Sequence, residues 1–191
     1  MSRFCALMFL GTALILLGPA CGSATTIRSM STFEMVAESA VIIRGTVEAQ
    51  RGLFNADMSR IYTDSTVLVT RVIAGKGVGS TTRSKRISVR QIGGRVGEVS
   101  MTVPGVARLA PGEDVVLFLR TDGTRHYLVG MSQGKFSLRK GPKGQTLVGR
   151  DLSGLHFLRS RGKPFGHPPV TAPPETFNAL VERIRTAGGL R

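Results

Sequence analysis

The sequence predicts a mainly β protein, built as a small antiparallel β-barrel with one helix near each end. Residues 115–119 are five consecutive apolar residues between the turn pairs Pro111-Gly112 and Asp122-Gly123, which predicts a strand buried on both faces. Shorter apolar or alternating segments recur between turn residues on both sides of this run. Helical spacing of apolar residues occurs only near residues 33–40 and 177–184.

Residues 1–24 have the form of a secretory signal peptide. Arg3 supplies the positive start, and the apolar stretch that follows, residues 4–18, is shorter than the ~20 residues that span a bilayer. Small residues stand at the −3 and −1 positions before the bond after Ala24, where we expect cleavage. Lipidation at Cys21 is the alternative. We therefore expect an exported protein, secreted or periplasmic, with a lipid anchor only in the second case.

Both cysteines of the chain, Cys5 and Cys21, fall within this leader. Cleavage after Ala24 therefore leaves a mature chain without cysteine, which excludes disulfides, thiolate zinc sites and a cysteine nucleophile. The remaining length is enough for one domain with a hydrophobic core of its own. We expect residues 25–158 to form the barrel domain.

The first element of that domain is a helix. Ser31 and Glu34 have the spacing of a capping box. The helical spacing predicts an apolar face made of Phe33, Val36, Ala37 and Ala40. A β-branched strand follows over residues 41–47, and Gly45 inside it indicates a bulge or a barrel bend.

A loop over residues 52–60 and a long strand over residues 61–73 come next. We expect Leu53, Phe54 and Met58 of the loop to lie against the core, with an exposed interaction cluster as the alternative. Alternation places Val67, Val69 and Ile73 inward on the strand. Residues 74–82 predict a flexible connection and lack the residue order of a P-loop.

Basic and apolar residues alternate over residues 85–92, which predicts a half-exposed strand. After a Gly-Gly turn, residues 96–103 are predicted to return as its antiparallel partner. The central hairpin then pairs residues 115–119 with residues 126–129, and shorter strands follow at residues 136–138 and 146–149.

The end of the chain combines a connector and a helix. Residues 159–174 form a proline-rich connector of extended character. Residues 175–191 carry the C-terminal helix, which ends at Gly188-Gly189. Its apolar face consists of Phe177, Leu180, Val181 and Ile184.

The chain is strongly basic, with 26 Lys and Arg against 12 Asp and Glu and a net charge of +14. Such a charge attracts polyanions. The densest group, and so the candidate polyanion contact, is Arg83, Lys85, Arg86 and Arg90. A general solubilising surface is the alternative, and the absence of tryptophan together with only two tyrosines argues against specific nucleic-acid binding.

No pattern in the sequence indicates catalysis. The three histidines, His126, His156 and His167, lack the spacing of metal ligands, and His126 is expected on the surface of a strand. Glu113 and Asp114 are neighbours that point to opposite faces of an extended chain, and Lys135 lacks a visible base partner. We therefore expect no catalytic residue, metal or cofactor, with an uncharacterised hydrolase as a remaining alternative.

The order of elements predicts a barrel of OB type. With AVIIRGTV, VTRVIAGKG and YLVGMSQGKF, the chain resembles the netrin-like module, the barrel that carries the inhibitory domain of the tissue inhibitors of metalloproteinases. It also resembles short exported bacterial proteins with a Gly-Glu before an LFL strand and a QGKF-like segment. The similarity covers about residues 31–147.

This resemblance implies a non-enzymatic module that binds a protein, with a protease as the first candidate partner. The Cys-x-Cys through which the inhibitors chelate zinc is absent, so the resemblance does not imply inhibition by that route. An electrostatic binder of anionic glycan or envelope polymer is the alternative function.

Overall fold

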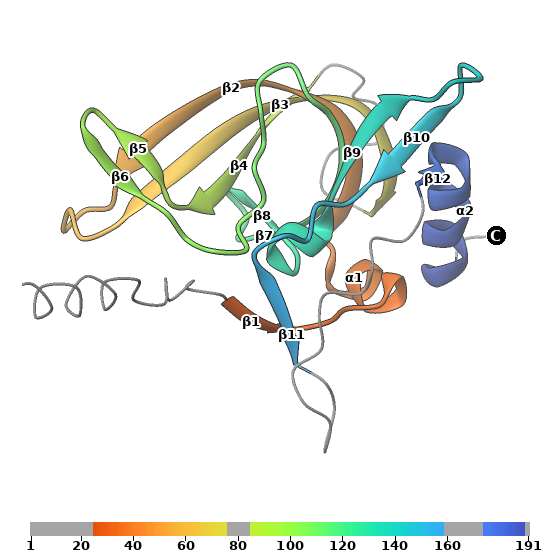
Figure 1. Ribbon diagram of the computed structural model, residues 1–191, viewed down its shortest axis with the longest axis horizontal. Coiled ribbons are helices and arrows are strands. Elements are labelled where there is room, and N and C mark those ends of the chain that lie inside the picture. The colour runs from red at the N-terminus through yellow and green to blue at the C-terminus, as the bar shows by residue number, and fades with distance from the viewer. Residues whose placement is uncertain (1–24, 76–84, 159–173, 190–191) are drawn as a thin grey trace, which may run out of the picture.

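The computed structural model describes residues 25–75, 85–158 and 174–189. The expected signal peptide, with Cys21 and Ala24, lies outside these ranges. Arg83 and the connector as far as residue 173 also lie outside them. Within the described residues, five strands close into a barrel (Figure 1). They are β2 (Val41–Phe54), β3 (Ile61–Gly75), β4 (Arg86–Ile92), β7 (Asp114–Thr121) and β8 (His126–Leu128). The order is β7-β2-β3-β4-β8, and pairing of β8 with β7 closes the ring. All pairings are antiparallel except that of β4 with β8.

Further strands extend or flank the barrel. β9 (Lys135–Lys140), β10 (Thr146–Gly149) and β12 (Glu175–Thr176) continue the sheet outward from β7. β5 (Gly94–Val96) and β6 (Val99–Met101) form a separate hairpin, and β1 (Thr25–Arg28) pairs in parallel with β11 (Leu155–Leu158). The helical elements are α1 (Thr32–Glu38), the short 3-10 helix η1 (Met131–Gly134) and α2 (Phe177–Ala187).

The strand predicted to be central, β7, has this role. It pairs with β2, β8 and β9, and the side chains of residues 115–119 are all 0% exposed. Val115, Leu117 and Leu119 belong to the core inside the barrel, whereas Val116 and Phe118 belong to a second core outside it. Two-sided burial explains why this strand is continuously apolar rather than alternating.

The outer core lies between the barrel and the two helices. The four predicted residues of α2, Phe177, Leu180, Val181 and Ile184, are buried there, as is Met35 of α1. Gly188 ends the helix as expected. The C-terminal helix thus packs with the barrel, because its apolar face shares the outer core with Val116 and Phe118 of β7.

The capping box of α1 is confirmed, but of its predicted apolar face only Val36 packs against the outer core. Ser31 Oγ accepts from the Glu34 N–H at 3.2 Å, and the Ser31 N–H donates to the Glu34 carboxylate at 2.8 Å. Phe33, however, is 65% exposed, and Met35 is the buried residue. The helix ends at Glu38, so Ala40 lies beyond it, and packing against α2 decides which side faces inward.

Two predictions for the strands near residues 52–60 and 96–103 are corrected. β2 continues to Phe54, which pairs with Ile61, so the loop shrinks to residues 55–60, and its Met58 is 68% exposed. Residues 96–103 are not the partner of β4, because β3 and β8 already occupy both edges of that strand. They instead contain β6, which pairs with β5.

Register shifts between β2 and β3 explain a further difference. The pairing slips between Arg44 and Gly45, which confirms the predicted bulge, and again between Ile42 and Ile43. A slip of one residue turns following side chains to the other face. Val67 and Val69 are therefore inside the barrel as predicted, whereas Ile73 packs against the outer core.

Candidate functional site

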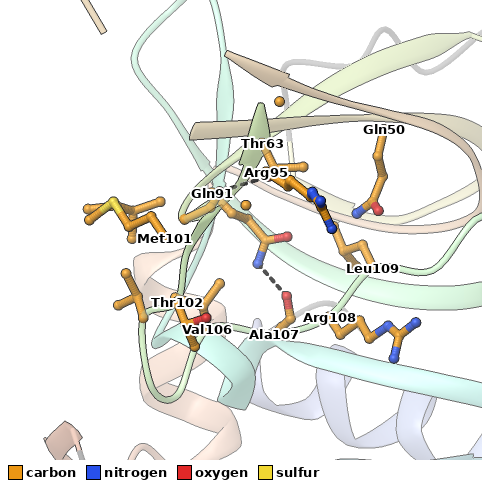
Figure 2. A pocket seen from close by; sticks show the side chains of 15 residues that line it. Gln50, Thr63, Gln91, Arg95, Met101, Thr102, Val106, Ala107, Arg108 and Leu109 are labelled. Carbon is orange, nitrogen blue, oxygen red and sulfur yellow. Dashed lines mark hydrogen bonds between the residues drawn. The ribbon is translucent and has the colours of Figure 1, made fainter. Parts of the chain in front are cut away.

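A hollow of about 580 Å³ opens at one end of the barrel, and we call it the barrel mouth (Figure 2). It lies at the end where β3 begins and β4 finishes, and the segment from Thr102 to Leu109 forms its far wall. Its lining includes Gln50, Thr63, Gln91, Arg95, Met101, Val106, Ala107 and Arg108.

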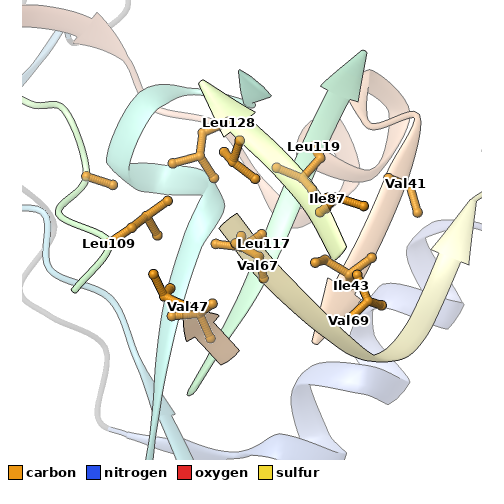
Figure 3. Packing of buried hydrophobic residues seen from close by; sticks show 13 residues of the cluster. Val41, Ile43, Val47, Val67, Val69, Ile87, Leu109, Leu117, Leu119 and Leu128 are labelled. Atoms are coloured by element: carbon orange, nitrogen blue, oxygen red, sulfur yellow. The ribbon is translucent and has the colours of Figure 1, made fainter. Parts of the chain in front are cut away.

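The wall of the barrel changes from apolar to polar as it approaches this mouth. Val67 and Val69 of β3 face the interior, and the same alternation brings Ser65 and Thr63 inward nearer the opening. On β4, Gln91 follows Ile87 and Val89 in the same way. Deeper in the barrel, apolar side chains converge to form the inner core (Figure 3).

Hydrogen bonds hold the polar layer in place. Gln50 Nε2 donates to Ser65 Oγ at 3.2 Å, and Thr63 Oγ1 donates to the Gly93 carbonyl at 2.7 Å. Gln91 Nε2 donates to the Ala107 carbonyl at 2.8 Å, which ties the far wall to β4. These hydrogen bonds therefore hold Gln50, Thr63 and Gln91 in place and shape the mouth.

A largely buried ion pair fixes the segment that leads from the mouth to β7. Lys135 Nζ lies 2.7 Å from Glu113 Oε1 and donates to the Arg108 carbonyl at 2.5 Å. Ser137 Oγ and the Ala110 N–H donate to the same carboxylate at 2.7 and 3.1 Å. Burial acts to raise the pKa of Glu113, but the hydrogen bonds outweigh it and the pKa lies below its ordinary value.

This ion pair corrects one expectation and agrees with another. Lys135 does have an acidic partner, and that partner holds it in a structural contact. Glu113 and its neighbour Asp114 do point to different faces, since Asp114 pairs with Arg44 at 2.6 Å.

A second hollow, of about 270 Å³, shares Gln91, Ile92 and Val106 with the mouth. It contains both tyrosines of the chain, Tyr62 and Tyr127, together with two arginines and Met131. We call the set Tyr62, Arg90, Arg120, Tyr127 and Met131 the tyrosine groove.

Cations stack on both aromatic rings of this groove. The guanidinium carbon of Arg90 lies 5.5 Å from the centre of the Tyr62 ring, and that of Arg120 lies 5.5 Å from the Tyr127 ring. Such cation–π contacts contribute about 0.5–1 kcal/mol at exposed sites and more where water is excluded. The four side chains thus form two ordered Tyr–Arg pairs.

Carboxylates fix the geometry of these pairs from the outside. Asp64 accepts both arms of the Arg90 guanidinium at 2.6 and 2.5 Å, and Asp122 accepts the Tyr127 hydroxyl at 2.8 Å. The N–H of Arg125 and the Tyr127 hydroxyl lower the pKa of Asp122 to about 2. The bond to Asp122 also raises the pKa of Tyr127, so its hydroxyl stays a donor at neutral pH. Among described residues, no carboxylate lies within ion-pair distance of Arg120.

The predicted polyanion contact is not a cluster of free cations in the described part of the chain. Arg86 makes two hydrogen bonds to Glu48 at 2.7 and 2.9 Å, and Arg90 is paired with Asp64. Lys85 is exposed, and Arg83 lies outside the described residues. Polyanion contact through this group stays a prediction, with two of its cations already paired.

The other residues considered for chemistry are dispersed. His126 is half-buried rather than on the surface, and burial lowers its pKa. Within residues 25–75, 85–158 and 174–189, no group of three His, Cys, Asp or Glu side chains is arranged to hold a metal ion. Neither helix in those ranges has the length and apolar character to cross a bilayer.

No protein-family model, curated protein or solved structure matches the chain.

Proposed function

We propose that this chain is an exported, non-enzymatic β-barrel module that binds a protein partner through the tyrosine groove. The observation that carries the proposal is the pair of Tyr–Arg stacks, Tyr62 with Arg90 and Tyr127 with Arg120, around one hollow. Tyrosine and arginine dominate the binding energy of protein interfaces, and methionine is also enriched there. Met131 lines the same hollow.

The fixed conformations of these side chains also support binding, in addition to their chemistry. Ordering a rotamer-rich side chain costs about 0.5–1.5 kcal/mol on association. Asp64 and Asp122 already hold Arg90 and Tyr127 in place. Binding of a partner therefore loses less side-chain conformational entropy. Arg120, which has no carboxylate partner among the described residues, is available to a carboxylate of the partner.

The tyrosine groove is a better candidate than the barrel mouth. In the mouth, Gln50, Thr63 and Gln91 already donate to acceptors within the chain. In the groove, Arg120 has no carboxylate partner among the described residues. A protease is the first partner class to examine, because the sequence resembles the netrin-like module of protease inhibitors. The buried contact between Lys135 and Glu113 supports a structural rather than a catalytic role for that lysine.

The test compares groove variants with a matched variant elsewhere. Residues 25–191 are immobilised, exposed to the native extracellular or periplasmic fraction, and the bound proteins are identified by mass spectrometry and purified for calorimetry. We expect Arg120→Ala and Tyr127→Ala to weaken binding of the partner by about 30-fold or more. Arg139→Ala, which removes an exposed arginine from β9, should leave affinity unchanged.

Equal affinity of the groove variants and the wild type would exclude the groove as the binding site. If the partner is a protease, its activity on a peptide substrate should fall when the chain is in excess. Release of cleaved partner by the wild-type chain would contradict the non-enzymatic proposal.

A further inference from the structure

Unpaired positive charge collects on the hairpin of β9 and β10. Arg139, Lys140 and Lys143 are exposed there, and none of them lies within ion-pair distance of a carboxylate in the described part of the chain. The sequence from Gly123 to Arg150 contains no Asp or Glu. The hairpin is therefore basic without internal compensation.

The surroundings of the hairpin leave this charge uncompensated. In Figure 1 the hairpin projects from the barrel beside α2, away from the β5–β6 hairpin. The acidic residue on the adjoining strand, Glu175, is already bonded to Arg183. By contrast, Arg86 and Arg90, in the densest basic group of the sequence, carry carboxylate partners.

We propose that the β9–β10 hairpin is a contact site for an anionic polysaccharide. Arg139 pairs with Leu147 and Lys140 with Thr146, so these adjacent side chains point to opposite faces, while Lys143 lies in the turn. Three cations that diverge in this way cannot converge on one small anion. A polymer with charge repeated along its length can contact them in succession.

The composition of the hairpin favours a polysaccharide over single-stranded nucleic acid. Proteins that bind single strands combine a basic surface with aromatic side chains on which bases stack. Residues 137–150 contain no aromatic side chain. Charge alone is sufficient to bind a sulfated or carboxylated glycan, which needs no stacking with aromatic side chains. The hairpin site shares no residue with the tyrosine groove.

The experiment measures binding of residues 25–191 to heparin, a sulfated polysaccharide, across a salt series. The hairpin variant replaces Arg139, Lys140 and Lys143 with Gln. The matched variant replaces Arg51, Arg60 and Arg108 with Gln, which removes the same charge from exposed positions elsewhere. We expect the hairpin variant to lose at least about tenfold in affinity at about 50 mM salt, and its log–log salt slope to become shallower by about 2 to 3. The matched variant should lose less than about threefold.

Equal losses in both variants would show that the whole positive field binds the polymer, and would overturn the hairpin as a site. Lack of heparin binding by the wild type at low salt would overturn it as well. Tighter binding of oligodeoxythymidine than of heparin at physiological salt would overturn the choice of polysaccharide. Retention of the groove's protein partner by the hairpin variant is expected and keeps the two sites separate.

Discussion

The ammonium group of Lys135 lies 2.7 Å from the carboxylate of Glu113, and it also donates to the main-chain carbonyl of Arg108. Both side chains are largely buried, with 11% and 21% of their surface exposed. The contact therefore fastens β9 to the segment that forms the far wall of the barrel mouth and then enters β7.

Breaking this contact should destabilise the fold. Removal of one member of a buried pair typically costs about 3–5 kcal/mol, because the other charge is left without its partner. We expect Lys135→Met to cost about 3 kcal/mol, and Glu113→Gln to cost less, because Gln still accepts from Ser137. Urea melts at pH 7 measure both, and Lys140→Met on the exposed end of β9 is the control, with a change of at most ~0.5 kcal/mol.

Acid should weaken the same contact. The pKa of Glu113 is below its ordinary value in the folded chain, so its ionised form stabilises the fold at pH values above the unfolded pKa of about 4.3. That stability is lost as the pH falls through the lower, folded pKa. The difference in unfolding free energy between wild type and Glu113→Gln should therefore shrink from pH 7 to pH 3. A constant difference across that range would show that Glu113 does not titrate as described.

Elements with a strong local signal could be predicted from the sequence. The apolar run of β7, the capping box at Ser31 and the apolar spacing of α2 each specify their structure within a few residues. The parallel pairings of β4 with β8 and of β1 with β11 could not, because no local pattern encodes contact between strands so far apart.

For the candidate site as well, local patterns could be predicted from the sequence, whereas contacts between distant strands could not. The polar layer of the mouth was implicit in the alternation that placed Val67 inward, because Ser65 lies on the same face. Tyr62 and Tyr127 line the same hollow because closure of the barrel brings β8 beside β4, and no local pattern in the sequence indicates that pairing. The partner of Lys135 likewise depends on the register between β7 and β9.

Leu117 tests the barrel itself. It is 0% exposed and lies among the converging side chains of the inner core (Figure 3). Leu117→Ala should cost about 2–5 kcal/mol, because it loses transfer free energy and leaves a cavity. Urea melts measure the loss, and Lys85→Ala at an exposed position should change stability by at most ~0.5 kcal/mol. If Leu117→Ala unfolds at the same urea concentration as wild type, Leu117 does not lie in the core.

Two glycines should respond to alanine for different reasons. A Cβ at Gly45 would lie 2.6 Å from the Leu68 carbonyl oxygen, so the strands of the bulge must move apart. Gly123, in the four-residue turn between β7 and β8, has φ +96° and open space around it. We expect Gly123→Ala to cost about 1–2 kcal/mol from backbone strain alone, and Gly45→Ala to cost more. Thermal melts rank the two, and the reverse order would contradict the close approach at Gly45.

Gln133 links the QGKF-like segment to the start of the domain. Its side chain is 1% exposed; Oε1 accepts from the Met30 N–H at 2.8 Å, and Nε2 donates to the Arg28 carbonyl at 3.1 Å. These two bonds hold the chain between β1 and α1 against η1. Gln133→Leu keeps a similar volume but leaves both main-chain groups without partners, at a cost of about 1–3 kcal/mol.

The loss of these two hydrogen bonds should first increase local opening around Met30, rather than unfolding of the whole domain. We expect the Met30 amide of Gln133→Leu to exchange with deuterium at least about tenfold faster than in wild type, because opening of this segment becomes less costly. The matched control is Gln145→Leu, since the side chain of Gln145 accepts from the Lys143 N–H within its own turn. Exchange at Met30 should be unchanged in that control. If Met30 exchanges at the wild-type rate in Gln133→Leu, the main chain there is held by β1–β11 pairing or by the capping box at Ser31, and not by Gln133.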